Sequence, residues 1–312
     1  MKYCQTEYDG TDLIMIIVKL MGGLGNQMFQ YAVGRHLSLI HNTELKLDVN
    51  SLLDRTPNPN VTYRNFDLDI FLFKPIFANK IDILRVKSER ILKPLRNVFF
   101  FIPDYSIQHI NEKGFNFDIN VLNSPNNSYL DGYWQSEKYF SQIQSIIRED
   151  FKIRGTVNKK ILDSINNSDS ICLNVRRGDY ISNPITNAFH GVYESDYFYK
   201  AVNILLKKVE NPEIFIFSDD INWCQNNLKF EVPTEIIFHE YAGKKFEKYL
   251  KLMSSCKHFI IPNSTFGWWA AWLSQNSSKI VISPKKWFKS DNWLNGKKII
   301  ESDIIPEKWM RI

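Results

Sequence analysis

Residues 14–49 read IMIIVKLMGGLGNQMFQYAVGRHLSLIHNTELKLDV. The apolar run at 14–20 predicts a buried strand, the glycines that follow predict a tight loop, and residues 28–40 have the apolar spacing of a helix. Residues 44–49 alternate between polar and apolar side chains, which predicts a second strand. A strand, loop, helix and strand in this order begin a parallel α/β sheet.

The remainder of the chain continues this alternation of strands and helices. A polar stretch near 152–168 interrupts it, so we expect two Rossmann-like domains, residues 1–155 and 156–312. Residues 65–125 are rich in Phe and Ile but irregular, and we expect short helices there. The other predicted strands cover residues 128–134, 171–175, 214–217, 235–238, 258–261 and 280–283, and the other predicted helices cover about 136–151, 195–209, 246–254 and 265–273.

The composition indicates a globular protein for small anionic ligands. Its 312 residues are 44% hydrophobic, which is enough to bury a sizeable core. The net charge of +5 fits an enzyme for anionic molecules or one that rests near acidic lipid. Lys and Arg are spread over the chain, so a nucleic-acid partner is not favoured.

The cysteines and the N-terminal segment indicate a cytoplasmic protein. Cys4, Cys172, Cys224 and Cys256 lie far apart without a CxxC pair, which predicts a reducing compartment and no structural zinc. The first apolar run is shorter than the about 20 residues of a membrane span and lacks a signal-cleavage pattern. We expect residues 1–14 to form a loose extension, and any membrane contact to be peripheral.

Three tryptophans crowd into the stretch Asn263-Ser264-Thr265-Phe266-Gly267-Trp268-Trp269-Ala270-Ala271-Trp272-Leu273. Ser or Thr before an apolar run begins a helix, because its hydroxyl accepts from a free amide of the first turn. The amides and hydroxyls at such a start form a seat for phosphate. The alternative is a buried aromatic helix with an ordinary cap, since aromatic stripes usually belong to the core.

Polar residues follow the strong strands of the second half, where ligands of open α/β sheets collect. Arg176 and Arg177 follow the strand that ends at residue 175, and Asp219 and Asp220 come directly after the strand that ends at 217 and Ser218. We expect Arg176 to bind phosphate oxygens and Arg177 to pair with an acid, with a solvated surface turn as the alternative. Either aspartate can accept from a guanine or a ribose hydroxyl, or simply cap the next helix.

The first glycine loop fits a dinucleotide site only in part. Gly23 and Gly25 match G-x-G-x-x-G, but Met28 stands where close helix packing needs Gly or Ala, so a nicotinamide cofactor is not favoured. The glycines still imply a close approach of the backbone to a ligand. Asn26 and Gln27 then offer amides to phosphate or to sugar hydroxyls.

Four segments together, at 22–32, 175–180, 217–220 and 263–269, resemble the alpha-1,2-fucosyltransferases of glycosyltransferase family 11, above all the bacterial members. The resemblance implies a GT-B fold whose two Rossmann-like domains face a central cleft, with the acceptor on the first domain and GDP-L-fucose on the second. It implies inverting transfer to the 2-hydroxyl of a terminal beta-galactoside, in an oligosaccharide, surface glycan or lipid-linked glycan. The alternatives are another linkage or acceptor, and a noncatalytic protein that binds a sugar nucleotide or glycan.

The same resemblance implies a reaction without metal or other cofactor. Asp67 and Asp69 match the D-x-D pattern of metal-dependent sugar transferases, but their alternation with apolar residues favours an amphipathic strand. No HxxxH or HExxH spacing is present.

The resemblance also assigns roles within the site. The family's second motif usually starts with His, where this chain has Asn174, and we expect this residue near the guanine. Arg176, Asn26 and the amides at 264–266 should stabilise the departing GDP, and Asp179 and His190 are the candidates for a base. The residues expected to bind the donor are Gly23, Gly25, Asn26, Gln27, Asn174, Arg176, Asp219, Asp220, Asn263, Ser264, Thr265 and Phe266.

Overall fold

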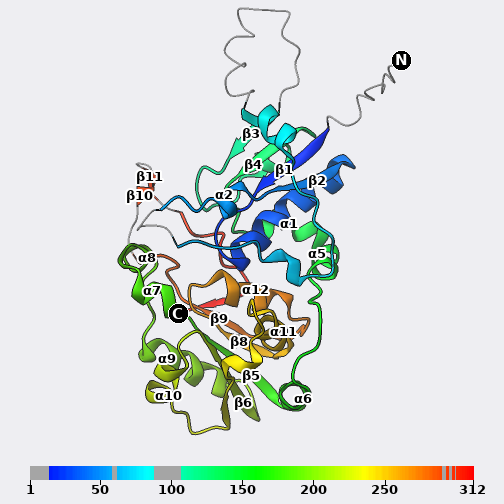
Figure 1. The fold of residues 1–312 in the computed structure, drawn as a ribbon. Coiled ribbons are helices and arrows are strands. Elements are labelled where there is room, and N and C mark those ends of the chain that lie inside the picture. Colours follow the sequence, from blue (N-terminus) through cyan, green and yellow to red (C-terminus); the bar gives the residue numbers. More distant parts are fainter. Residues whose placement is uncertain (1–13, 58–61, 88–106, 290–292, 295–296, 299) are drawn as a thin grey trace, which may run out of the picture.

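The computed structural model describes residues 14–57, 62–87, 107–289, 293–294, 297–298 and 300–312. Two parallel sheets lie one above the other, each accompanied by helices (Figure 1). The predicted α/β fold of two Rossmann-like units, the GT-B type, is confirmed. Of the predicted N-terminal extension only Ile14 is described, and Cys4 lies outside the described residues.

The first sheet has the strand order β2-β1-β4-β3. Its strands are β1 (Met15–Lys19), β2 (Glu44–Asp48), β3 (Gln108–Asn111) and β4 (Ser128–Asp131), and every pairing is parallel. Helix α1 (Leu24–His41) connects β1 to β2, as the opening stretch of sequence predicts. Strand β3 was not predicted, because its residues carry no apolar alternation.

The second sheet has the order β12-β9-β8-β5-β6-β7 and is also parallel throughout. In chain order this is the 3-2-1-4-5-6 arrangement of the doubly wound fold, and the order reverses between β5 and β8. Ligands of such sheets bind at the carboxyl ends of the strands that flank the reversal. The strands are β5 (Asp169–Val175), β6 (Pro212–Ser218), β7 (Thr234–Ile236), β8 (His258–Ile260), β9 (Val281–Ser283) and β12 (Met310–Arg311), and all but the last were predicted.

Two predictions of local structure are wrong. The segment 136–151 is broken into two 3-10 turns and a short helix, since Phe140 leaves the helical region with φ −138° and buries its ring. Asp69 lies in a 3-10 turn that begins directly after Asp67, rather than in a strand, because the Asp67 amide donates to the Gln27 side chain instead of a neighbouring strand.

Short helices occur between the sheets' strands and in the segment 65–125, where residues 80–87 are helical. The remaining elements are α2 (Asn50–Leu53), η2 (Leu68–Ile70), α4 (Ile119–Leu122), η3 (Glu137–Tyr139), η4 (Ser141–Ile143), α5 (Gln144–Asp150), α6 (Lys159–Asn167), α7 (Gly178–Ser182), α8 (Pro184–His190), α9 (Ser195–Leu206), α10 (Ile221–Asn227), η5 (His239–Tyr241), α11 (Glu247–Ser255), α12 (Thr265–Leu273) and the antiparallel pair β10 (Trp293–Leu294) and β11 (Lys297–Lys298).

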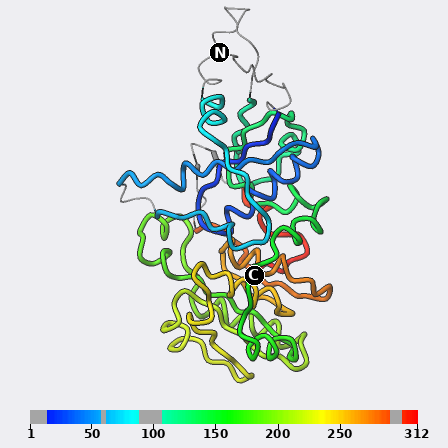
Figure 2. The backbone as a smooth tube through the Cα atoms, turned by 45° about the vertical axis from the view of Figure 1, so that its right-hand side comes forward, coloured from blue at the N-terminus to red at the C-terminus, as the bar shows by residue number. Residues whose placement is uncertain are grey.

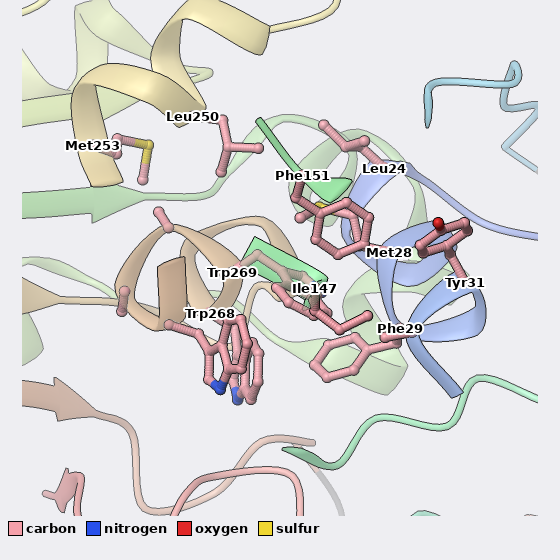
Figure 3. Packing of buried hydrophobic residues seen from close by; sticks show 14 of the residues in the cluster. Leu24, Met28, Phe29, Tyr31, Ile147, Phe151, Leu250, Met253, Trp268 and Trp269 are labelled. Carbon is pink, nitrogen blue, oxygen red and sulfur yellow. The ribbon is translucent and has the colours of Figure 1, made fainter. Parts of the chain in front are cut away.

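A shared hydrophobic core joins the two domains, with α12 at its centre. The Phe29 ring of α1 lies 4.5 Å from the Trp268 ring and 4.9 Å from the Trp269 ring, measured between centroids, and Figure 3 shows α1 and α12 facing each other through these side chains. The C-terminal segment returns to the same junction (Figure 2), where the Trp268 indole donates to the Ile304 carbonyl. The two domains are therefore fixed to each other close to the ends of both sheets.

Candidate functional site

A cavity of about 380 Å³ lies between the two domains, at the carboxyl ends of β5 and β8. It therefore occupies the strand-order reversal, where the doubly wound fold places its ligands. The predicted site residues that line it are Gly23, Gly25, Asn26, Asn174, Arg176, Asp179, His190, Asp219, Asn263, Ser264, Thr265 and Phe266. Gln27 and Asp220 are not among the lining residues.

Two helix N-termini meet at this cavity. Helix α1 begins after Gly23 and helix α12 begins after Ser264, and neither has a side-chain cap. The expected hydroxyl cap of α12 is thus absent, and within the described residues no protein acceptor is found for the amides of Thr265 and Phe266. Unpaired amides and the positive end of each helix dipole make this edge of the cavity suitable for an anion.

Gly25 allows the two helix starts to touch. A Cβ atom on Gly25 would lie 2.6 Å from the carbonyl carbon and Oγ1 of Thr265, and the Trp269 indole donates to the Gly25 carbonyl over 2.9 Å. A larger residue would push α1 and α12 apart. The glycine predicted to permit a close backbone approach therefore serves helix packing in this structure.

Arg176 stands at the end of β5 among carboxylates. Its Nη1 lies 2.9 Å from Asp219 Oδ2, and its Nη2 lies 2.5 Å from Asp179 Oδ1. The Arg64 guanidinium, from the other domain, also donates to Asp179. Arg176 thus lines the cavity with its guanidinium held by two carboxylates, and Asp179 has two guanidinium partners.

Arg177 has the structural role that the sequence predicted. Its Nη1 lies 2.9 Å from Glu194 Oε2, and its guanidinium lies 4.0 Å from the Trp223 ring centroid. Asp220 accepts from the Trp223 amide as the cap of α10. The capping alternative therefore describes Asp220 better than donor binding does.

Gln27 was predicted to bind the donor, but it is not among the residues that line the cavity. Its side chain is fully buried and donates to the carbonyls of Gly22 and Asn65, and it accepts from the Asp67 amide. All of its polar atoms are used inside the N-terminal domain, so none is left for a donor phosphate. Asn26, by contrast, lines the cavity and accepts from Gln135.

The two asparagines predicted to bind the donor from the second domain, Asn174 and Asn263, flank the reversal of strand order. The Asn263 amide donates to the carbonyls of His190 and Trp287, so it fixes the loop before α12. Asn174 donates to the Phe217 carbonyl over 3.2 Å, while its buried Oδ1 has no partner within the described residues. This oxygen faces the start of α12, since a Cβ atom on Gly267 would lie 2.5 Å from it.

The two candidate bases differ in their surroundings. The His190 ring stacks on Tyr180 at 4.8 Å, and its Nδ1 has no partner in the described part of the chain. Burial lowers the pKa of His190 to about 4, so the ring is neutral at pH 7. Asp179 is held by two guanidinium groups, those of Arg64 and Arg176, so its oxygens are already engaged in ion pairs.

Several residues that line the cavity were not predicted, namely Thr62, Arg64, Asp67, Gln135 and Lys245. Lys245 reaches across from the second domain and lies 2.7 Å from Asp69 and 3.8 Å from Asp67. The D-x-D carboxylates therefore face a lysine ammonium. Burial raises the pKa of Asp67, against the opposing effect of Lys245.

Comparison with known proteins gives consistent results. The family model described as Glycosyl transferase family 11 matches residues 13–310. An alpha-1,2-colitosyltransferase from Escherichia coli is 31% identical over 96% of this chain and 99% of its own length. A galactoside 2-alpha-L-fucosyltransferase from Caenorhabditis elegans is 26% identical over 59% of this chain and 52% of its own. A mutant of Arabidopsis thaliana FUT1 in complex with GDP is 13% identical, with a TM-score of 0.48 over 89% of this chain and 72% of that structure. Among the described residues, no helix is both long and apolar enough to span a bilayer.

Proposed function

Since this chain belongs to glycosyl transferase family 11, we propose that it transfers L-fucose from GDP-beta-L-fucose to the 2-hydroxyl of a terminal beta-galactoside, with inversion and without a metal. The acceptor is an oligosaccharide or a surface or lipid-linked glycan, and the reaction takes place in the cytoplasm or at the membrane surface. The observation that carries the proposal is the convergence of Arg176 and two uncapped helix N-termini on one cavity. This arrangement suits a diphosphate that must be stabilised as it departs.

The geometry suggests how the reaction proceeds. The bond between the fucose anomeric carbon and the β-phosphate oxygen breaks, and its electron pair leaves with GDP. Arg176 and the amides at the start of α12 stabilise that charge. The acceptor oxygen forms the new bond from the opposite face of the sugar, through a transition state with oxocarbenium character.

The proton of the acceptor hydroxyl needs only a weak base in this scheme. An oxocarbenium-like carbon is strongly electrophilic, so little proton transfer is required before the new bond forms. His190 lines the cavity and is neutral at pH 7, and its buried Nδ1 has no partner among the described residues, whereas Asp179 is engaged by arginines. We propose His190 as the proton acceptor and Asp179 as the residue that orients Arg176.

The domains divide the substrates between them in this proposal. The second domain, with its full doubly wound strand order, binds the nucleotide, and Asn174 lies near the guanine. The first domain, residues 1–155, provides the acceptor side.

A second donor is favoured by a specific similarity. The Escherichia coli relative, matched over nearly its whole length, is named for colitose, which is fucose without its 3-hydroxyl group. The experiment therefore offers GDP-L-fucose and GDP-colitose in parallel, each with lactose, and measures GDP release and the product linkage by NMR. Transfer of fucose to the galactose 2-hydroxyl supports the proposal, transfer of colitose alone replaces the donor, and binding without turnover identifies a noncatalytic protein.

Arg176→Ala tests the proposed mechanism. Removing a preorganised donor costs about 2.7–4 kcal/mol of transition-state stabilisation, so we expect kcat to fall about 100-fold or more. Near wild-type turnover in this variant would contradict the role of Arg176.

A further inference from the structure

Residues 62–67 of the N-terminal domain, which we call the strap, form part of the cavity wall. Thr62, Arg64 and Asp67 all line it. Gln27 holds the strap from below, because its amide donates to the Asn65 carbonyl over 2.8 Å and accepts from the Asp67 amide over 2.9 Å. The strap is therefore fixed next to the start of α1.

The opposite domain holds the strap as well. The Lys245 ammonium donates to the Phe66 carbonyl over 2.6 Å and to Asp69 over 2.7 Å. On the outer side, Arg55 donates to the Asn65 side chain over 2.7 Å. The strap backbone is thus anchored at three points, independently of the Arg64 side chain.

The Arg64 guanidinium points from the strap toward the uncapped start of α1. A Cβ atom on Gly23, the residue before that helix, would lie 3.9 Å from Arg64 Nε. In the described part of the chain the guanidinium donates to a single acceptor, Asp179. Its side chain is 33% exposed and lines the cavity, and a guanidinium has five N–H donors in all.

The other cations of the cavity are more fully engaged. Arg176 contacts two carboxylates, those of Asp179 and Asp219, and Lys245 is tied to the strap. A nucleoside diphosphate brings about two negative charges into a cavity whose cations already have acidic partners. Among the lysines and arginines that line the cavity in the described residues, Arg64 has the fewest protein acceptors, and it lies beside a helix N-terminus.

We infer that Arg64 is a donor-diphosphate ligand supplied by the N-terminal domain, and that Asp179 holds both Arg64 and Arg176 in place until the donor binds. The inference rests on the proposed function and adds a residue to it. It adds a charged side chain of the first domain to the start of α1 as a contact for the diphosphate. Guanidinium groups bind phosphate oxygens bidentately, so both arginines can exchange the Asp179 carboxylate for phosphate without large movement.

The test compares binding of GDP and GMP by isothermal titration calorimetry. Arg64→Ala removes a hydrogen bond between a charged side chain and the diphosphate. We therefore expect this variant to bind GDP about 10- to 100-fold more weakly than the wild type. Binding of GMP, which lacks the β-phosphate, should change less than about three-fold in the same variant. Arg64→Lys should lie between Arg64→Ala and the wild type, since it keeps the charge but loses the planar fork.

Arg55→Ala is the matched control, because it loosens the strap without removing a cation from the cavity. We expect it to affect GDP and GMP equally and weakly. Unchanged GDP affinity in Arg64→Ala, or equal losses for GDP and GMP, would overturn the inference and leave Arg64 as an interdomain ion pair only. Failure of the wild-type protein to bind GDP would instead overturn the proposed function together with this inference. Circular dichroism melting curves confirm that each variant is folded before binding is measured.

Discussion

Replacing Gly25 with alanine has opposite effects on the free energy of unfolding according to helix propensity, which favours alanine, and tertiary packing, which does not. The sign of the measured change shows which effect is larger. Gly25 lies in the first turn of α1, where alanine is intrinsically favoured by about 1 kcal/mol. In the structure, however, the new Cβ would lie 2.6 Å from Thr265 and 2.8 Å from the Phe266 amide, and ordinary contacts begin at 3.4 Å. The two helix starts would have to separate by about 0.8 Å. Overpacking of this kind costs about 1–3 kcal/mol, so the net change should be a loss of up to about 2 kcal/mol.

The same displacement should impair catalysis, because it moves the amides that face the proposed diphosphate. A misplacement of about 1 Å can cost about 100-fold in rate, so we expect kcat/KM of Gly25→Ala to fall about 10- to 100-fold. Thermal unfolding is followed by calorimetry, with Gly23→Ala as the control for stability, since its Cβ would meet only Arg64 Nε at 3.9 Å. A melting temperature of Gly25→Ala above that of the wild type would refute the packing argument.

Three further outcomes follow from the site. Trp269→Phe and Trp268→Phe each remove one buried indole donor, and each should lower the free energy of unfolding in chemical denaturation by about 1–3 kcal/mol. Only Trp269→Phe should also weaken GDP binding, because only the Trp269 indole holds the start of α1. Burial lowers the pKa of His190 from 6.5 to about 4. Between these pH values the unfolded chain binds a proton that the folded chain does not, so the stability of the folded protein should fall as the pH falls from about 6.5 to 4. The melting temperature of His190→Asn should depend less on pH in that range. Activity should be unchanged in EDTA, and a large loss would restore Asp67 and Asp69 as metal ligands.

The parts of the site that follow strands could be predicted from the sequence. Parallel strands end at the same edge of a sheet, so the polar residues after 175, 217 and 261 had to lie close together once the strands were recognised. Arg176, Asp219 and Ser264 indeed line one cavity. Periodicity identified the strands, and topology then determined which residues meet.

The sequence could not show which of two adjacent residues of the same chemical type would reach the cavity. Asn26 and Gln27 are adjacent amides, yet one lines the cavity and the other is buried beneath the strap. Asp219 and Asp220 are adjacent carboxylates, yet only the first reaches the cavity. Arg64 carries no motif at all, because its position depends on how a loop of one domain crosses to the other.

The far end of α12 explains how this helix can present an uncapped N-terminus to a ligand. At its C-terminus Arg148 donates to the carbonyls of Trp272 and Leu273 over 2.6 and 2.8 Å, and Lys279 donates to the carbonyls of Ala271 and Ser274. Burial lowers the pKa of Lys279 to about 8, with a contribution from Arg148.

These two cations bind the negative end of the helix, while the tryptophans hold its sides in the shared core. The unpaired amides at the other end are the part of α12 left for a ligand. The helix is anchored along its length before any ligand binds. In the proposed reaction its amides can therefore stabilise the departing phosphate without moving. Fixed dipoles contribute most to a reaction rate under this condition.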